Sequence, residues 1–152
     1  MKMLPQIGAR LGIRRQPDIL AVVDTIAKIL SVAVGGAAGS VARHLVNISP
    51  LSRLFENFPF PTFFINVSGS FMIGFFLILL TDKFQVSENL RMMVIVGFLG
   101  AFTTFSTFEA EIYGLLRDES RMQAFIYLAA SVVVGFVGLV AGVSLARSFP
   151  DR

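Results

Sequence analysis

The segment GFLGAFTTFSTF, residues 97 to 108, places hydroxyl side chains and phenylalanines close together in an otherwise apolar stretch. Hydroxyl groups can replace backbone hydrogen bonds that are lost where a membrane helix is broken. Gly100 supplies permissive backbone dihedrals for such a break, and carbonyls freed there are oxygen ligands for a small cation. We therefore expect a broken helix with a cation site in this segment.

Phe105 and Phe108 follow the expected break at positions i and i+3, on one helical face. The edge of an aromatic ring carries partial positive charge, so two ring edges facing a cavity could contact a small anion without holding it tightly. Packing in a core is the alternative interpretation. Ser106, between the two rings, belongs to the same candidate pathway. Glu111 comes near the end of the span, where exposure at the interface is the default expectation.

A second apolar stretch, PTFFINVSGSFMIGFF, contains a row of polar residues. Thr62, Asn66 and Ser70 stand at i, i+4 and i+8, on one face of a helix, whereas Ser68 and Gly69 fall elsewhere. An asparagine in lipid requires hydrogen-bond partners. The row is either the wall of a polar pathway or a hydrogen bond between helices, worth about 1 kcal/mol.

The last apolar stretch repeats this pattern more weakly. Tyr127 and Ser131 stand at i and i+4, and Gly135 continues the row. Close packing of helices explains the glycines here, and also those of SVAVGGAAGSVARHLV, where small residues recur every three or four positions. Arg43, in the latter stretch, is costly inside a membrane. It either extends to the headgroups or faces a water-filled vestibule that attracts anions.

Composition places these stretches in a membrane protein. The chain has 152 residues, of which 55% are hydrophobic and 15% charged, with a mean hydropathy of +0.74. Soluble domains contain about 25% charged residues. The absence of cysteine excludes disulfides and thiol nucleophiles, and His44 is the single histidine, which excludes a histidine metal cluster. No basic stretch is interleaved with aromatics, so nucleic acid is not an expected partner.

Four apolar segments have the roughly 20 residues that a transmembrane helix needs: residues 26–48, 61–81, 92–116 and 124–146. We expect an all-α membrane protein with four transmembrane helices, the third of them broken. Residues 1–25 are expected to form a basic N-terminal tail, residues 26–146 the four-helix domain, and residues 147–152 a C-terminal tail.

The distribution of Lys and Arg gives a weak signal for orientation. With four spans, one side of the membrane would carry eight such residues and the other three, which favours cytoplasmic termini. Four of the eight lie in the first fifteen residues, and without them the comparison is four against three. A core this neutral could insert in both orientations, whereas the basic tail favours a single one.

Three motifs occur in order: GGAAGSVARH, PTFFINVSGSFMIG and GFLGAFTTFSTFEAE. Together they resemble the small bacterial fluoride channels, the CrcB or Fluc family, over about residues 31 to 146. The resemblance implies a dual-topology homodimer of antiparallel four-helix subunits in the bacterial inner membrane. It also implies two fluoride pathways and a structural Na⁺ at the centre of the dimer.

The resemblance also implies roles for individual residues. Gly100 and Thr103 would be the backbone positions that coordinate Na⁺. The fluoride pathway would be formed by Phe105, Phe108, Asn66, Thr62, Ser70, Ser106, Tyr127, Ser131, Arg43 and Glu111. Many relatives have Ser or Thr one turn after the position of Ser131, whereas this chain has Gly135. The far end of the polar track therefore differs here.

The expected function is passive export of cytoplasmic fluoride, which relieves fluoride toxicity. A negative membrane potential drives an anion outward through any selective pore. A proton-coupled exporter of cations is the alternative, but it would place a carboxylate in the middle of the first or second span, and neither has one. A noncatalytic assembly subunit would leave the polar row as a helix contact. No nucleophile and base can be assembled around the single histidine, so an enzyme is not expected.

Overall fold

The computed structural model describes residues 19–53 and 58–150. Residues 1–18 of the expected tail and the last two residues of the chain lie outside the described residues. Within them, every regular element is helical: α2 (Ile19–Ile48), η1 (Pro50–Arg53), α3 (Phe60–Ile78), η2 (Leu79–Lys83), α4 (Glu88–Arg91), η3 (Met92–Leu99), α5 (Gly100–Phe102), α6 (Ser106–Arg117) and α7 (Arg121–Arg147).

These elements form four helical segments that are long and apolar enough to cross a membrane: Ile19–Ile48, Phe60–Lys83, Glu88–Arg117 and Arg121–Arg147. The four expected spans are thereby confirmed. The first helix begins at Ile19, ahead of the expected start of its span at residue 26, because the apolar sequence ILAVV continues the helical pattern toward the N-terminus.

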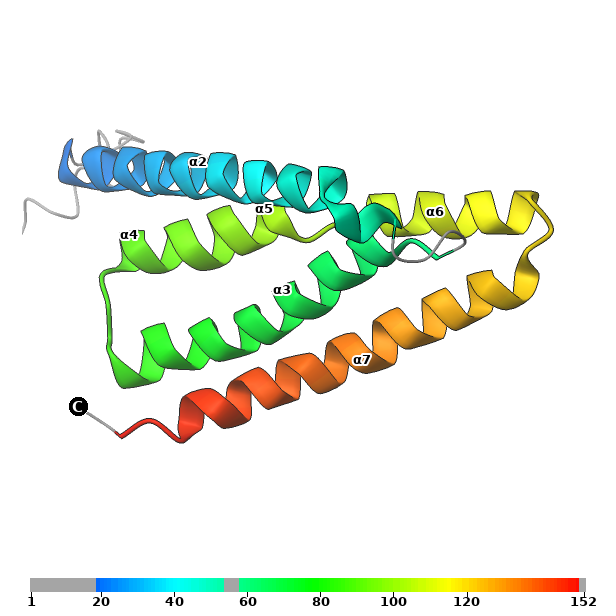
Figure 1. Cartoon of the computed structure of the whole chain (residues 1–152). Coiled ribbons are helices and arrows are strands. Elements are labelled where there is room, and N and C mark those ends of the chain that lie inside the picture. The colour runs from blue at the N-terminus through cyan, green and yellow to red at the C-terminus, as the bar shows by residue number, and fades with distance from the viewer. Residues whose placement is uncertain (1–18, 54–57, 151–152) are drawn as a thin grey trace, which may run out of the picture.

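The helices pack as two extensive pairs, α3 against α7 and α2 against η3 and α5 (Figure 1). Glycines at both contacts bring backbones together. A methyl group on Gly35 or Gly39 would overlap a backbone carbonyl of the third helix, and one on Gly142 would overlap a carbonyl of α3. Packing therefore accounts for these glycines, as the sequence predicted, because a larger residue would separate the helices.

The third helix is broken, as expected, but the break does not lie at Gly100. Gly100 has helical dihedrals, φ −63° and ψ −34°. The chain leaves the helix at Thr103, with φ −75° and ψ 158°, and resumes it in α6 at Ser106. The prediction that Gly100 supplies the break is therefore wrong, because the extended conformation of Thr103 has a negative φ and needs no glycine.

Candidate functional site at the helix break

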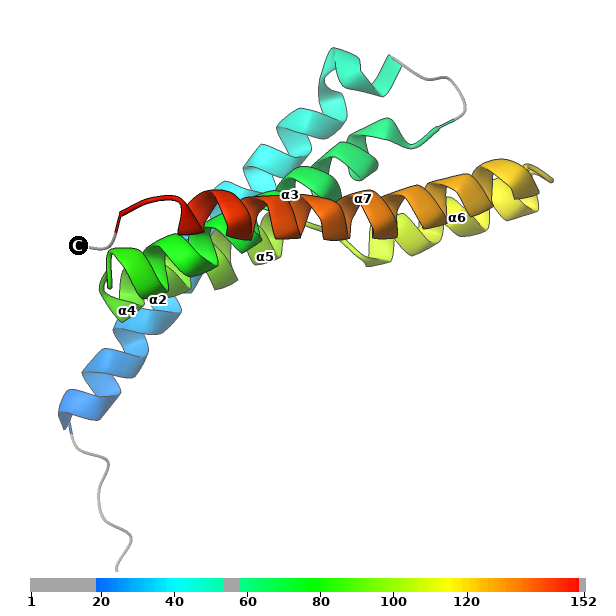
Figure 2. The ribbon, with the colours of Figure 1, turned by 90° about the horizontal axis from the view of Figure 1, so that it is seen from below.

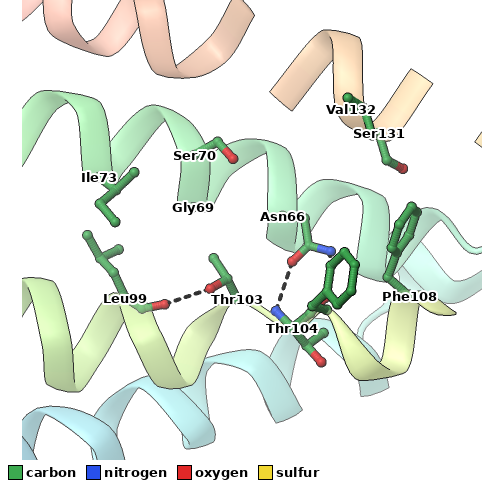
Figure 3. A pocket seen from close by; sticks show the side chains of 11 residues that line it. Asn66, Gly69, Ser70, Ile73, Leu99, Thr103, Thr104, Phe108, Ser131 and Val132 are labelled. Atoms are coloured by element: carbon green, nitrogen blue, oxygen red, sulfur yellow. Dashed lines mark hydrogen bonds between the residues drawn. The ribbon is translucent and has the colours of Figure 1, made fainter. Parts of the chain in front are cut away.

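Asn66 of α3 holds the break in place through both ends of its side-chain amide. Its Oδ1 accepts a hydrogen bond from the Thr104 amide at 2.9 Å, and its Nδ2 donates to the Thr104 carbonyl at 2.9 Å (Figure 3). Both backbone polar groups of Thr104, which lies outside the helices, are thus hydrogen-bonded. Backbone that is not helical needs such partners within a membrane. This pair of bonds is the interhelical contact that the polar row of α3 allowed.

The hydroxyl groups of the segment satisfy the backbone on either side of the break. Thr103 donates from Oγ1 to the Leu99 carbonyl at 3.0 Å. The Thr104 hydroxyl accepts from the Thr107 amide at 3.3 Å and donates to the Thr107 hydroxyl at 3.0 Å. Because Phe105 already has helical dihedrals, Thr104 acts as the N-cap of α6. The expected role of the hydroxyls is confirmed for Thr104, whereas the Leu99 carbonyl that the Thr103 hydroxyl contacts also accepts from the Thr103 amide.

Two carbonyls at the break are released from helical pairing. In a continuous helix, the amides of Thr104 and Thr107 would donate to the carbonyls of Gly100 and Thr103. Here those amides donate to Asn66 and to the Thr104 hydroxyl instead. Gly100 is also exposed, and a methyl group built on it would meet no atom within 4 Å. Among the described residues, the carbonyls at the two positions expected to hold a cation thus lack their usual helical partner amides.

A cavity of about 320 Å³ lies beside the break, between α3 and α7 (Figure 3). Its walls are neutral and mix amide, hydroxyl and apolar groups: Asn66, Gly69, Ser70, Ile73, Leu99, Thr103, Thr104, Phe105, Phe108, Ser131 and Val132. The Ser131 hydroxyl is buried and finds no hydrogen-bond partner among the described residues. A buried hydroxyl of this kind is available to a ligand.

Two glycines shape the cavity. A methyl group on Gly69 would overlap the Thr103 side chain, so Gly69 gives the break room to approach α3. Although Gly69 falls off the polar row of α3, it lines the cavity. A methyl group on Gly135 would lie 3.5 Å from the Ser70 hydroxyl oxygen. At the level where Gly135 gives α7 no hydroxyl, Ser70 of α3 supplies one.

Glu111 of α6 joins three helices in a polar cluster. Its Oε1 accepts a hydrogen bond from the Thr62 hydroxyl at 2.8 Å, and its Oε2 accepts from the Tyr127 hydroxyl at 2.7 Å. Thr62 is 2% exposed and Tyr127 is fully buried. Glu111 is therefore only partly exposed, rather than exposed as expected by default, because two hydroxyls hold its carboxylate between helices.

The two phenylalanines of the break have different surroundings. Phe108 is 5% exposed, and its ring packs edge to face on Tyr127 with a centroid separation of 5.1 Å. Phe105 is 71% exposed, with its ring centroid 6.0 Å from that of Phe108. Both line the cavity. Phe108 thus connects the cavity to the Glu111 cluster, whereas Phe105 lines the cavity from an exposed position.

The other expected site residues lie apart from the cavity. Ser106 is exposed at the start of α6, and Arg43 is partly exposed on α2. Neither lines the cavity, and the side chain of Arg43 has no hydrogen-bond or ion-pair partner in residues 19–53 and 58–150. The structure thus assembles Asn66, Ser70 and Ser131 with the two phenylalanines, beside the cluster of Thr62, Glu111 and Tyr127.

Two residues of the site were missed at the level of sequence. Thr104 is 9% exposed, and it both caps α6 and receives Asn66. The sequence feature that could have identified Thr104 as a cap is its place three residues before Thr107, near the start of a helix. Phe58 packs edge to face on Tyr127, with ring centroids 5.2 Å apart. No periodic pattern marks Phe58, because it lies in a connection before α3.

We expect Asn66→Leu to loosen the break without unfolding the helices. Leucine leaves the Thr104 amide and carbonyl unpaired, at a cost of about 1–3 kcal/mol for each buried group. Amide hydrogen exchange over residues 99–108, measured by mass spectrometry, should therefore accelerate by about tenfold or more. Ser68→Ala is the matched control, because Ser68 bonds only to carbonyls of its own helix. Equal exchange in both variants would contradict the role given to Asn66.

Comparison with known proteins bears on this arrangement. The sequence model of the family described as CrcB-like protein, Camphor Resistance (CrcB), matches residues 30–143. Proteins named fluoride-specific ion channel FluC are similar over most of their length. Those of Hydrogenobaculum sp. (strain Y04AAS1), Roseiflexus sp. (strain RS-1) and Rhizobium etli are 42%, 38% and 43% identical to this chain.

The matched regions cover 74%, 80% and 78% of this chain and 92%, 98% and 95% of those three relatives. The match contains the second and third helices that could cross a membrane and most of the first and fourth, together with the break, the cavity and the Glu111 cluster. This multi-pass membrane protein therefore belongs to the CrcB-like family.

Proposed function

We propose that this protein is a fluoride-selective ion channel that exports cytoplasmic fluoride passively down its electrochemical gradient. The observation that carries the proposal is the neutral cavity at the helix break, which has an unpartnered hydroxyl, Ser131, and two phenylalanine rings in its walls. The names of its relatives support the same ion. The protein is a channel and not an enzyme.

The walls of the cavity suit a small anion. α6 begins beside it, and the first turn of a helix presents unpaired amides and a partial positive charge. Ser131 offers a hydroxyl donor, and the rings of Phe105 and Phe108 can offer positive edges. No carboxylate lines the cavity. Weak neutral donors allow an anion to enter and also to leave, which conduction requires.

The driving force is the membrane potential. Hydrogen fluoride crosses a membrane as a neutral acid and dissociates in a more alkaline cytoplasm, which traps the anion. A potential worth about 2.3 kcal/mol per charge per 100 mV then drives fluoride outward through a selective pore. Passive export through such a pore relieves fluoride toxicity without a nucleotide or a coupled ion.

We further propose that the channel is a homodimer of antiparallel subunits. Gly100 is exposed, Phe105 is 71% exposed, and both lie at the break, so one subunit leaves this part of the cavity uncovered. Residues of a second copy would complete the wall. The near-neutral charge balance of the four-helix core is compatible with insertion in both orientations.

We also propose that the carbonyls of Gly100 and Thr103 hold a structural Na⁺ in this dimer. Their release from helical pairing supports this, because oxygen donors of unwound membrane helices suit sodium. A bound cation would neutralise the negative ends of these dipoles. Thermal unfolding of the purified protein should then occur at a lower temperature in N-methylglucamine chloride than in sodium chloride. An identical midpoint in the two salts would count against the site.

Fluoride efflux from proteoliposomes tests the proposed function. Vesicles containing the purified protein should release fluoride, followed with a fluoride electrode, and should retain chloride in a matched chloride experiment. The reason is that close contacts with hydroxyls, one amide and ring edges favour the smaller anion. Equal fluxes of the two ions would refute the assignment, and so would no flux of either.

Substitution of the phenylalanines tests their contact with the ion. Phe105→Ile and Phe108→Ile should each suppress fluoride flux, because isoleucine fills comparable space but has no ring quadrupole. Phe136→Ile is the matched control, since Phe136 is 66% exposed on α7 and does not line the cavity. The three variants should elute as the wild-type assembly on size exclusion. Unchanged flux in both cavity variants would return the pair to a packing role.

Cysteine labelling tests the orientation of the subunits. The chain has no cysteine, so Gln85→Cys and Glu119→Cys each introduce a unique thiol, in the second and third connections. With antiparallel subunits, an impermeant reagent on intact cells should label about half of the copies of each variant, since dual insertion places either connection outside equally often. Full labelling of one variant and protection of the other would establish a single orientation.

A further inference from the structure

Phe58, in the connection before α3, supports the ring of Tyr127 from outside the helices. Its ring packs edge to face on Tyr127, with centroids 5.2 Å apart and an interplanar angle of 80°. Phe108 packs edge to face on the same ring, at 5.1 Å and 66°. Phe108 lines the cavity, whereas Phe58 does not. Tyr127 is thus held between a ring of the cavity wall and a ring that lies beyond it.

Phe58 is itself anchored to the start of α3. Its ring meets that of Phe63 edge to face, with centroids 5.6 Å apart and an interplanar angle of 69°. Its carbonyl accepts a hydrogen bond from the Phe60 amide at 2.6 Å. Edge-to-face pairs of this kind stabilise an arrangement beyond the area that they bury. The half-buried Phe58 ring is therefore a fixed support for Tyr127.

The position of the Tyr127 ring decides where its hydroxyl points. α6 runs alongside α7 as far as the turn that joins them (Figure 2). Across this contact the Tyr127 hydroxyl donates to Glu111 Oε2 at 2.7 Å, while Thr62 donates to Oε1 at 2.8 Å. Both carboxylate oxygens are therefore occupied by hydroxyl donors, one of which depends on how the Tyr127 ring is held.

The Glu111 carboxylate lies close enough to the cavity for its orientation to matter. Glu111 follows Phe108 by three residues, on the same face of α6, and the residues that line the cavity include no carboxylate. A carboxylate that lost one of its hydroxyl donors would be freer to turn toward the cavity. Negative charge there would repel an anion, and the repulsion is strong where water is scarce.

We propose that Phe58 is a positioning residue of the channel. It holds the Tyr127 ring against Phe108, so that the Tyr127 hydroxyl keeps the Glu111 carboxylate bound beside the ion pathway. Phe58 acts through Tyr127 and does not itself contact the ion. The effect on conduction rests on the proposed function, whereas the hold on Tyr127 does not.

Near-ultraviolet absorption follows the hydrogen bond of Tyr127 directly. The chain has two tyrosines and no tryptophan, so Tyr113→Phe, at a 69% exposed site, leaves Tyr127 as the single tyrosine. A phenol that donates to a carboxylate absorbs at longer wavelength than one that does not. In this background, Phe58→Leu should move the Tyr127 band to shorter wavelength, toward its position in Glu111→Gln, whose neutral acceptor binds the hydroxyl more weakly.

A double variant separates the loss of this bond from a change in the surroundings of the ring. In the Glu111→Gln protein the charged acceptor is already gone, so adding Phe58→Leu should move the Tyr127 band little further. Phe58→Met replaces Phe58→Leu if the leucine variant does not purify. An equal shift with and without the Glu111 carboxylate would contradict an action through that bond.

Fluoride efflux from proteoliposomes measures the consequence for conduction. Phe58→Leu should lower the efflux about threefold to tenfold, the range set by the loss of one edge-to-face ring pair. Phe58→Tyr, which keeps the ring, should retain wild-type efflux. Phe76→Leu is the matched control, because Phe76 is also half-buried and also forms an edge-to-face pair, with Phe75, but does not line the cavity. All variants should elute as the wild-type assembly on size exclusion.

The two measurements distinguish the failure of this inference from the failure of the proposed function. An unmoved Tyr127 band in Phe58→Leu would overturn the positioning role, even if efflux fell. A shifted band with wild-type efflux would overturn its link to conduction. If the wild-type protein released no fluoride, the proposed function would be rejected, and the absorption band alone would decide whether Phe58 positions Tyr127.

Discussion

The pair of hydrogen bonds between Asn66 and the backbone of Thr104 is the constraint on which the site depends. Because the Thr104 amide is taken by α3, the Gly100 carbonyl is free. Because Thr104 is held outside the helix, its hydroxyl can cap a new helix. The oxygen donors, the start of α6 and the position of both phenylalanines all follow from one side-chain amide, which costs little in a membrane because its Oδ1 and its Nδ2 are both hydrogen-bonded.

Close helix packing makes the hydrogen bonds between Asn66 and Thr104 possible. The glycines of α2 and α7 allow direct backbone contact with the third helix and with α3, and Gly69 makes room for the Thr103 side chain at the break itself. A bulkier side chain at Gly69 would move α3 away from the break, and Asn66 would then no longer reach Thr104. The cavity therefore lies where tightly packed helices meet a segment that cannot be helical.

Periodicity predicted the four spans, the shared face of Asn66 and Ser70, and the use of hydroxyls at a break, because each depends on residues near one another in the sequence. The position of the break was not predictable in this way, since it is decided by Asn66, 38 residues away. The partners of Glu111 were missed for the same reason: Thr62 lies 49 residues earlier. Helical periodicity says which residues share a face but not which helix that face meets.

The order of Asn66 and Thr104 along the chain has a consequence for biosynthesis. Asn66 precedes Thr104, so α3 has already left the ribosome when the third helix emerges. That third segment is apolar enough to be inserted as one unbroken span, with its carbonyls paired internally. Docking on α3 can then exchange those internal bonds for the side-chain amide, which makes the break a product of assembly in the bilayer and lets insertion proceed without exposing unpaired backbone to lipid.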